Sequence, residues 1–236
     1  MLEISLVVPF FNEEKILSEK INEIHKYLKK NFKDFELILV DDGSVDSSNQ
    51  IAKSTIANLN NVSLITSKVN MGRWNAIRKG LQEAKGKIQG YLDVDLEIKL
   101  EYIPPALKIL NAADIVIASK FASGAKVQTP ALRKISSFFF NLLVNLILHT
   151  GLTDHQAGFK FFRKEVLDNI LKLSQQDGWL WDIEILYLAK KKRYTVVEIP
   201  IKIRYGYRNI RSTFLFDFIK MPFFVLELKR KVDKIK

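Results

Sequence analysis

The sequence has 236 residues, of which 47% are hydrophobic and 27% are charged, so the chain can bury a sizeable core and does not have the composition of a disordered segment. It contains no cysteine, which excludes disulfides and thiolate metal sites. The formal net charge of +11 indicates an anionic partner. The first residues, MLEISLVVPFFNEE, have no basic segment before the apolar run, so we expect no signal peptide and a cytoplasmic location.

Strand and helix patterns alternate along the first 95 residues. Buried strands are predicted at residues 3–9, 35–42, 62–67 and 87–95, and helices at residues 12–32, 44–59 and 73–84. This alternation predicts an α/β fold in which a mostly parallel sheet is flanked by helices. Ligands of such sheets bind beyond the carboxyl ends of the strands.

A polar cluster follows each of these four predicted strands. The clusters are Pro9–Glu13, Asp41–Ser44, Asn70–Arg73 and Asp93–Glu97. Because the carboxyl ends of parallel strands share one edge of a sheet, the four clusters predict a single binding site. Gly72 would let the backbone turn tightly beside a ligand, although this stretch could also be an ordinary helix-entry turn.

Three carboxylates occur at alternate positions in the fourth cluster, at Asp93, Asp95 and Glu97. Side chains that alternate along a strand point the same way, and like charges repel unless a cation lies between them. With no histidine or cysteine nearby, the expected ion is Mg²⁺ or Mn²⁺, which shares its ligands with substrate phosphates. The alternative is a solvated acidic turn.

A set of motifs extends the interpretation over most of the chain. In order, they are VVPFFNEE, LILVDDGSVDSS, NMGRWNAIRKGL, YLDVDLE, DHQAGFKFFRKEVL and WDIEILYLAKKKRYTVVEIPI. Together they resemble the family 2 inverting glycosyltransferases of the Rossmann-like GT-A fold, in particular the branch of dolichyl-phosphate mannose synthase and polyprenyl-phosphate glycosyltransferases. The resemblance covers roughly residues 3–204 and implies a nucleotide-sugar donor, a divalent metal and inversion at the anomeric carbon.

The resemblance implies roles for individual residues on the donor side. The residues expected at the nucleotide sugar are Pro9, Asn12, Glu13, Asp41, Asp42, Gly72, Arg73 and Asp93, with Asp41 and Asp42 reading the base and ribose. Asp93 and Asp95 are the expected metal ligands, and Glu97 would serve as a third. Glu97 stands where glutamine is common in the family, and Phe11 stands where tyrosine is more usual.

On the acceptor side, residues 119–134 interrupt the alternation and are predicted to form a mobile loop. The resemblance implies that the acceptor phosphate is bound by Lys120, Arg133, Arg208 and Ser212, and that Asp95, Asp154 and Arg133 take part in catalysis, Asp154 as a base or acceptor organiser. Lys120 replaces a usual arginine, and a lysine meets phosphate without a bidentate fork. Lys120 and Arg133 could instead be solubilising charges.

Other residues near these motifs depart from the family pattern or have two interpretations. His155 and Gln156 are unusual after Asp154, and His155 is expected to form local hydrogen bonds rather than bind a metal. Thr213 occupies a position where lysine is common. The residues expected on the far wall of the site are Trp179, Trp181, Asp182 and Glu184, of which Trp181 and Asp182 could equally be core and helix-cap residues.

Two apolar segments suggest that the protein binds at a membrane surface. Residues 135–151 are too short and too interrupted by polar residues for a span, so they form either a core helix or one at a bilayer surface. Residues 204–236 hold nine Lys/Arg against three Asp/Glu, a net charge of +6. We therefore predict a GT-A domain at residues 1–210 and a basic amphipathic C-terminal helix at 211–236. That helix would lie on an anionic membrane or a membrane-embedded partner, or pack on the core.

The predicted reaction moves a hexose from a donor of the GDP-mannose or UDP-glucose type to a polyprenyl or dolichyl phosphate, with Mg²⁺ or Mn²⁺, at the cytoplasmic face of a membrane. Because a phosphate is already anionic near neutral pH, it needs no general base. One alternative is a glycosyltransferase that acts on a hydroxyl group of a cell-surface glycan. Others are a catalytically weak scaffold and a basic nucleic-acid-binding module, the last opposed by the four acidic clusters.

Overall fold

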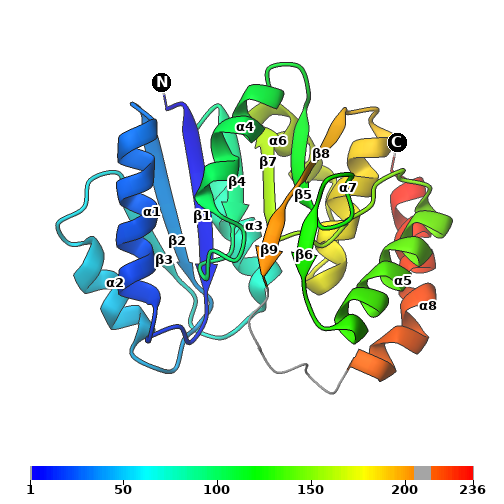
Figure 1. Ribbon diagram of the computed structural model, residues 1–236, viewed down its shortest axis with the longest axis horizontal. Coiled ribbons are helices and arrows are strands. Elements are labelled where there is room, and N and C mark those ends of the chain that lie inside the picture. The colour runs from blue at the N-terminus through cyan, green and yellow to red at the C-terminus, as the bar shows by residue number, and fades with distance from the viewer. Residues whose placement is uncertain (1, 205–213, 236) are drawn as a thin grey trace.

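The computed structural model describes residues 2–204 and 214–235. Its main sheet has seven strands in the order β3-β2-β1-β4-β7-β5-β8, and all are parallel except β7, which is antiparallel to both of its neighbours (Figure 1). The strands are β1 (Ile4–Phe10), β2 (Phe35–Asp41), β3 (Val62–Thr66), β4 (Ile88–Leu92), β5 (Ile115–Ser119), β7 (Phe159–Arg163) and β8 (Val196–Pro200). The predicted α/β fold with a mostly parallel sheet is confirmed.

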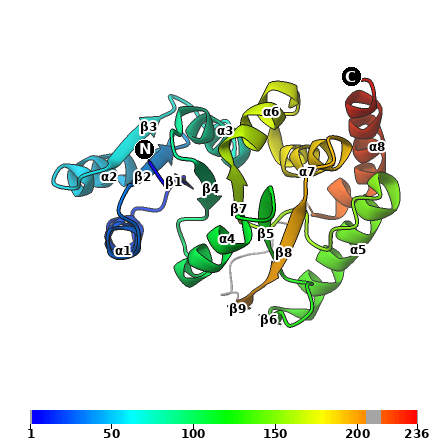
Figure 2. The same ribbon diagram turned by 90° about the horizontal axis from the view of Figure 1, so that it is seen from above.

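Helices cover both faces of the sheet (Figure 2). One face packs on α1 (Leu17–Asn31), α2 (Ser48–Ile56) and α4 (Ile103–Ile109), the last preceded by a 3₁₀ turn at Leu100–Tyr102. The other face packs on α3 (Arg73–Glu83), α6 (Lys164–Leu173) and α7 (Trp181–Lys191), with α5 (Ala131–Leu148) and α8 (Phe214–Asp233) beyond them. A second 3₁₀ turn lies at Gly178–Leu180, and the strands β6 (Lys126–Gln128) and β9 (Lys202–Arg204) form a separate parallel pair.

Three elements differ by three residues or more from the sequence prediction at an end beside a polar cluster. Helix α1 begins at Leu17 rather than residue 12, and α2 begins at Ser48 rather than residue 44. Strand β4 ends at Leu92 rather than residue 95. In each case the residues released from the predicted element form a loop whose polar groups bond across the chain, as described below.

Strand β7 runs against β4, and its first residue, Phe159, pairs with the last residue of β4, Leu92. The loop that precedes β7 therefore meets the sheet at the edge where the parallel strands end. In this way the loop at residues 153–158 is brought next to Asp93, which follows β4.

The C-terminal helix α8 packs beside α5 in both views (Figures 1 and 2). Its inner residues Met221, Val225, Leu228 and Val232 are buried in the same core as α5 and α7. The predicted boundary between residues 210 and 211 lies outside the described residues. Among the described helices, none is both long and apolar enough to cross a membrane.

Candidate active site

An open cleft of about 480 Å³ lies at the carboxyl ends of β1, β2 and β4 and the start of α3. It is lined by Pro9, Phe10, Phe11, Glu13, Asp42, Asn70, Gly72, Arg73, Asp93, Val94, Asp95 and Glu97. Each of the four polar clusters that the sequence singled out contributes to this lining. The prediction that the four strand ends deliver their polar residues to one site is confirmed.

The loop after β1 is held by the loop after β2. Asn12 adopts a positive φ of 54°, its backbone N–H donates to Ser44 Oγ at 3.0 Å, and its Oδ1 accepts from the backbone N–H of Val45 at 2.9 Å. The backbone N–H of Glu13 donates to Ser48 Oγ at 2.8 Å. These cross-loop bonds explain why α1 and α2 begin later than predicted. They also give Asn12 a positioning role at the cleft, which its side chain does not line.

The two aspartates at the end of β2 have different surroundings. Asp41 is buried, and its carboxylate accepts hydrogen bonds from the backbone of Ser44 at 2.9 Å and from Asn49 Nδ2 at 2.6 Å. Asp42 lines the cleft and accepts from the backbone N–H of Met71 at 2.9 Å. Asp42 is thus the member of the pair placed to meet a ligand, while Asp41 shapes the loop. Their roles toward base and ribose stay predictions.

Gly72 has a φ of 94°, a conformation that side chains strongly disfavour, and no atom lies within 4 Å of the position that a Cβ would take. Gly72 is the N-cap of α3 and also lines the cleft, so the turn is a helix entry, and its place beside a ligand stays a prediction. The turn brings Arg73, the first residue of α3, to the floor of the cleft. The guanidinium stacks on the Trp74 ring at 4.2 Å from its centroid, and Nε donates to Asp93 Oδ1 at 2.5 Å.

Asp93, Asp95 and Glu97 lie in a turn and not on a strand. The turn is closed by a hydrogen bond from the Leu96 N–H to the Asp93 carbonyl oxygen at 3.1 Å, and Leu96 has a positive φ of 54°. The argument that strand alternation aligns the three carboxylates was therefore wrong. The turn itself brings all three to the same cleft.

The residues present fit a metal that arrives with a phosphate ligand. Asp93 has 40% of its side chain exposed, and Asp95 also lines the cleft, so two hard oxygen donors face the same space. Within residues 2–204 and 214–235, no group of three or more His, Cys, Asp or Glu is arranged to hold a metal. Glu97 lines the same cleft, and its role as a third metal ligand stays a prediction.

A buried charge network lies behind Asp93. Asp182 Oδ1 accepts from Lys160 Nζ at 2.8 Å and from the Tyr91 hydroxyl at 2.5 Å, while Asp182 Oδ2 lies 4.0 Å from Arg73 Nη1. Burial, and then the charge of Asp182, raises the pKa of Tyr91 well above its ordinary value, so the hydroxyl keeps its proton and donates. Burial lowers the pKa of Lys160 against the opposing attraction of Asp182.

Lys160 and Tyr91 were missed by the sequence analysis. The available signal was a lysine in the apolar run Phe159–Phe162, because a charge inside a buried strand needs a partner. Asp182, which was predicted either for the far wall or for a helix cap, is that partner.

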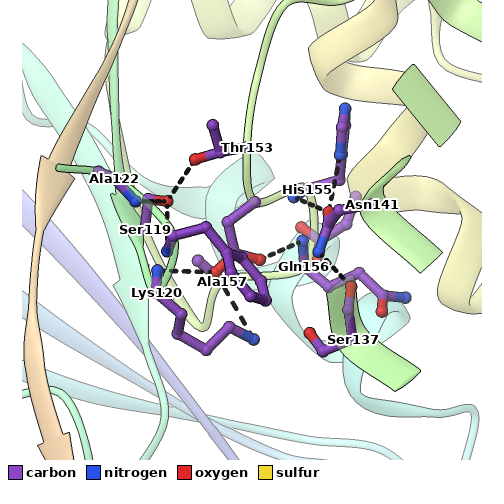
Figure 3. Close-up of polar contacts among 12 residues, drawn as sticks. Ser119, Lys120, Ala122, Ser137, Asn141, Thr153, His155, Gln156 and Ala157 are labelled. Atoms are coloured by element: carbon purple, nitrogen blue, oxygen red, sulfur yellow. Dashed lines mark hydrogen bonds and ion pairs between the residues drawn. The ribbon is translucent and has the colours of Figure 1, made fainter. Parts of the chain in front are cut away.

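On the acceptor side, the structure brings Lys120 and Asp154 together. Asp154 is fully buried, and its Oδ2 accepts from the Lys120 backbone N–H at 3.1 Å and lies 3.5 Å from Lys120 Nζ. The backbone N–H groups of Thr153 and Asp154 donate to Glu198, and Ser119 Oγ bonds Thr153 Oγ1 at 2.7 Å (Figure 3). Asp154 does not line the cleft, so in this structure it organises the loop.

His155 links this loop to α5 (Figure 3). The Asn141 Oδ1 atom accepts from both the backbone N–H and the ring Nδ1 of His155 at 2.9 Å, and His155 Nε2 lies 2.7 Å from Thr150 Oγ1. Burial, and then the charge of Lys160, lowers the pKa of His155 to about 3. The prediction of a local hydrogen-bonding role is confirmed, and the ring is neutral at physiological pH.

The remaining predicted residues fall into two groups. The side chain of Arg133 and all of Arg208, Ser212 and Thr213 lie outside what the structure describes, so their acceptor roles stay predictions. Of the expected far-wall residues, Trp181 is a core side chain, and Trp179 packs between Phe140 and Phe224. Glu184 accepts from Ser174 Oγ and from the backbone of Gln175 and Gln176, so it shapes the loop after α6.

A mostly parallel sheet whose strand ends surround one acidic cleft is the architecture expected of a GT-A glycosyltransferase. The family described as glycosyl transferase family 2 matches residues 5–171. That match covers more than half of the 236 residues, and the chain belongs to this family. The family membership inferred from the motifs is confirmed.

Several characterised proteins are similar to the chain. Dolichyl-phosphate β-glucosyltransferase ALG5A of Trichomonas vaginalis is 33% identical over 212 residues, which make up 84% of this chain and 65% of that protein. The human dolichyl-phosphate β-glucosyltransferase is 29% identical and is covered to 66%. Glycosyltransferase AglD of Haloferax volcanii is 26% identical over 85% of this chain and 33% of that protein. The chain thus spans two thirds or less of the length of these relatives.

Among solved structures, glucosyl-3-phosphoglycerate synthase from Mycobacterium tuberculosis in complex with Mn²⁺, UDP-glucose and phosphoglyceric acid is similar with a TM-score of 0.69. The similarity covers 98% of this chain and 80% of that one at 19% identity. At this identity it supports the fold.

Proposed function

We propose that the protein transfers glucose from UDP-glucose to a polyprenyl or dolichyl phosphate, with inversion at the anomeric carbon and with Mg²⁺ or Mn²⁺. The observation that carries the proposal is the cleft lined by Asp42, Arg73, Asp93 and Asp95 in a family 2 fold. The relatives named for a sugar and a lipid are dolichyl-phosphate β-glucosyltransferases, and the structural neighbour binds UDP-glucose and Mn²⁺. These names favour glucose over the mannose donor that the sequence left open.

In this proposal each half of the site handles one substrate. Asp42 would orient the nucleoside, and Asp93 and Asp95 would hold the metal, whose chemistry when bound would be Lewis-acid stabilisation of the negative charge on a diphosphate leaving group. Lys120 meets the acceptor phosphate as a point charge. Because the attacking phosphate oxygen is already anionic, no side chain has to remove a proton, which agrees with a buried Asp154 that is paired with Lys120.

The test is transfer of labelled sugar by the purified protein. UDP-glucose and GDP-mannose are each offered with a polyprenyl phosphate or with the matching polyprenol, in Mn²⁺, in Mg²⁺ or in EDTA. We expect a labelled glucolipid only with UDP-glucose, the phosphate and a metal. A product with a hydroxyl acceptor alone would favour the alternative glycosyltransferase, and no product with any combination would contradict the proposal.

We infer in addition that the protein docks peripherally on the cytoplasmic face of an anionic membrane, where the lipid acceptor resides. Two adjacent helices expose an apolar face, formed by Ile135, Phe138, Phe139, Leu142 and Leu146 of α5 and Phe223 and Leu226 of α8. Exposed basic residues accompany it, with Lys134 on α5 and Lys220 and Arg230 on α8. Apolar burial and attraction to anionic headgroups add in such a helix pair.

Vesicle sedimentation tests this inference. We expect wild-type protein to bind vesicles with anionic lipid more tightly than neutral ones, and the double variant F139E/L146E to lose about tenfold or more in binding, because two apolar contacts are replaced by charges. Val45→Glu is the matched control, since Val45 is also an exposed apolar residue but lies away from this face. Equal binding by the double variant and the control would contradict the inference.

A further inference from the structure

The cleft contains an internal cation at the place where a metal ligand is expected. Arg73 Nε donates to Asp93 Oδ1 at 2.5 Å, and 28% of the Arg73 side chain and 40% of that of Asp93 are exposed. A hydrogen bond between two charged groups is stronger than one between neutral groups. A divalent ion that binds Asp93 must therefore compete with Arg73.

Arg73 is not needed to neutralise the buried charge behind it. Asp182 has its close cationic partner in Lys160, at 2.8 Å, and takes a further hydrogen bond from Tyr91. The distance from Asp182 to Arg73 is 4.0 Å. Lys160 also donates to the carbonyl oxygen of Ala157 at 2.9 Å, which fixes it in place. The guanidinium can therefore move without leaving Asp182 as an unpaired buried charge.

Arg73 also has unused hydrogen-bonding capacity. Among the described residues, its Nη1 and Nη2 atoms are buried and have no hydrogen-bond partner, and the same holds for Asp182 Oδ2. A buried donor without a partner costs roughly 1–3 kcal/mol, and more when the group is charged. A guanidinium that uses only Nε can offer its planar fork to two oxygens of one anion once it turns out of this buried position toward the cleft, the geometry in which arginine binds phosphates.

The Arg73–Asp93 pair is closely enclosed. A Cβ added to Gly158 would lie 2.0 Å from Asp93 Oδ2 and 3.3 Å from Arg73 Nη2, so both groups rest against the backbone of the loop before β7. This packing holds the pair together in the absence of a competing ligand, and it leaves the cleft side of Asp93 as the direction open to a metal.

We propose that Arg73 determines when a metal can bind to Asp93. It occupies Asp93 when no ligand is bound, so that a bare divalent cation binds weakly, and it releases Asp93 when a metal–diphosphate supplies oxygens for Nη1 and Nη2. The inference rests on the proposed function, because it takes Asp93 as a metal ligand. It goes beyond that function in assigning the order of events: the metal enters together with the nucleotide and not before it.

Manganese binding measured by electron paramagnetic resonance of the free ion tests the inference without any turnover. We expect wild-type protein to bind Mn²⁺ weakly alone and tightly with UDP. Arg73→Gln and Arg73→Met should bind Mn²⁺ alone at least about tenfold more tightly than wild type, because each removes the positive charge beside Asp93, the proposed metal ligand. In these variants UDP should enhance Mn²⁺ binding much less than in wild type.

Two controls separate charge from shape. Arg78→Gln, on the same helix and paired with Asp177, should behave as wild type. Arg73→Lys keeps the charge and should keep bare Mn²⁺ binding within about threefold of wild type. Circular dichroism checks folding, and either neutral variant suffices if the other does not fold.

The outcomes distinguish this inference from the proposed function. Neutral variants that bind bare Mn²⁺ no more tightly than wild type would overturn the inference, while tight binding of Mn²⁺ with UDP by the wild type would leave the proposed function standing. Tighter binding by Arg73→Lys as well would also overturn it, because the charge would then not be what excludes the metal. No Mn²⁺ binding by any protein, with or without UDP, would contradict both.

Discussion

The two halves of the site use polar residues in opposite ways. On the donor side, Asp42, Asp93 and Asp95 line an open cleft at the strand ends. On the acceptor side, Asp154 and His155 are buried, and their polar atoms bond within the protein to Lys120, Gln156, Asn141 and Thr150. Motif residues of the same family pattern therefore line the cleft in one half and bond within the framework in the other.

The difference shows that a motif carboxylate has to be judged by its partners. Asp93 is paired with Arg73 but retains 40% exposure, so a ligand can displace the arginine. Asp154 has no exposed surface, and its backbone and side chain are held by Glu198, Lys120 and the N–H of Gln156. Substitutions on the donor side should mainly change binding and rate, whereas those on the acceptor side should mainly change stability.

The largest effect is expected from Asp95→Asn. Loss of one of the two proposed metal-binding carboxylates should lower kcat/KM about 10³-fold, since a bound metal would contribute several kcal/mol to stabilising the leaving group. Steady-state transfer of labelled glucose measures this. Glu97→Gln is the matched comparison, because Glu97 lines the same cleft while the proposed function assigns the metal to Asp93 and Asp95, and we expect a loss of about tenfold or less. Equal losses for the two variants would mean that the turn has no preferred metal ligand.

Gly158→Ala should lower transfer about 10²-fold. The new methyl group would lie 2.0 Å from Asp93 Oδ2 and has to displace the carboxylate or the loop, a misplacement at the reacting centre. Gly151→Ala is the control, since Gly151 has a φ of 76° but no atom within 4 Å of a Cβ, so that backbone strain is present without a clash. Transfer and thermal unfolding are measured on both. An active Gly158→Ala protein would contradict this close packing.

Asp154→Asn should lower the free energy of unfolding by about 2–3 kcal/mol, because it removes the buried negative charge that pairs with Lys120. Transfer to the lipid phosphate should stay measurable, since no base is required. Urea unfolding and transfer are both recorded. Asp168→Asn breaks an exposed ion pair with Lys164 and should cost less than about 1 kcal/mol. Complete loss of transfer by a well-folded Asp154→Asn protein would favour a hydroxyl acceptor.

The smallest effect concerns the pH dependence of stability. The folded-state pKa of His155 is about 3, below its ordinary value, so below about pH 6.5 the unfolded chain takes up a proton that the folded protein does not. Stability therefore falls as the pH falls. From about pH 7.5 to about pH 5 this histidine should remove about 2 kcal/mol from the free energy of unfolding.

Urea unfolding at the two pH values measures that loss. His155→Gln should show a smaller decrease between them, by the same amount, because glutamine does not titrate. An equal decrease in both proteins would show that His155 is protonated in the folded protein or does not govern the pH dependence of stability.

Local patterns predicted the donor side well. The alternation of strands and helices was sufficient to place Asp42, Gly72 and Asp93 at one edge, because parallel strands leave no other arrangement of their ends. The helix starts were predicted too early, since the apolar period says nothing about Ser44 and Ser48, whose hydroxyls hold the preceding loop away from a helix. Such bonds join residues more than 30 positions apart.

The acceptor side and the charge network could not be predicted in the same way. The burial of Asp154 depends on where β7 enters the sheet, and this strand pairs with β4 and β5 across long stretches of chain. Lys160 could be recognised as unusual in its apolar strand, but its partner Asp182 lies 22 residues further on in another helix. Long-range pairing, and not local propensity, decides these contacts.

The reversed direction of β7 has a consequence for how the protein can be redesigned. A strand that runs against its neighbours starts where they finish, so the connection at residues 149–158 reaches the same rim as the loops of the first four strands without being built from any of them. Exchanging that one connection for the corresponding segment of a relative, with Gly158 kept because it packs against Asp93, should therefore change one part of the rim by itself. The loops after β1, β2 and β4, which line the cleft, would keep their shape.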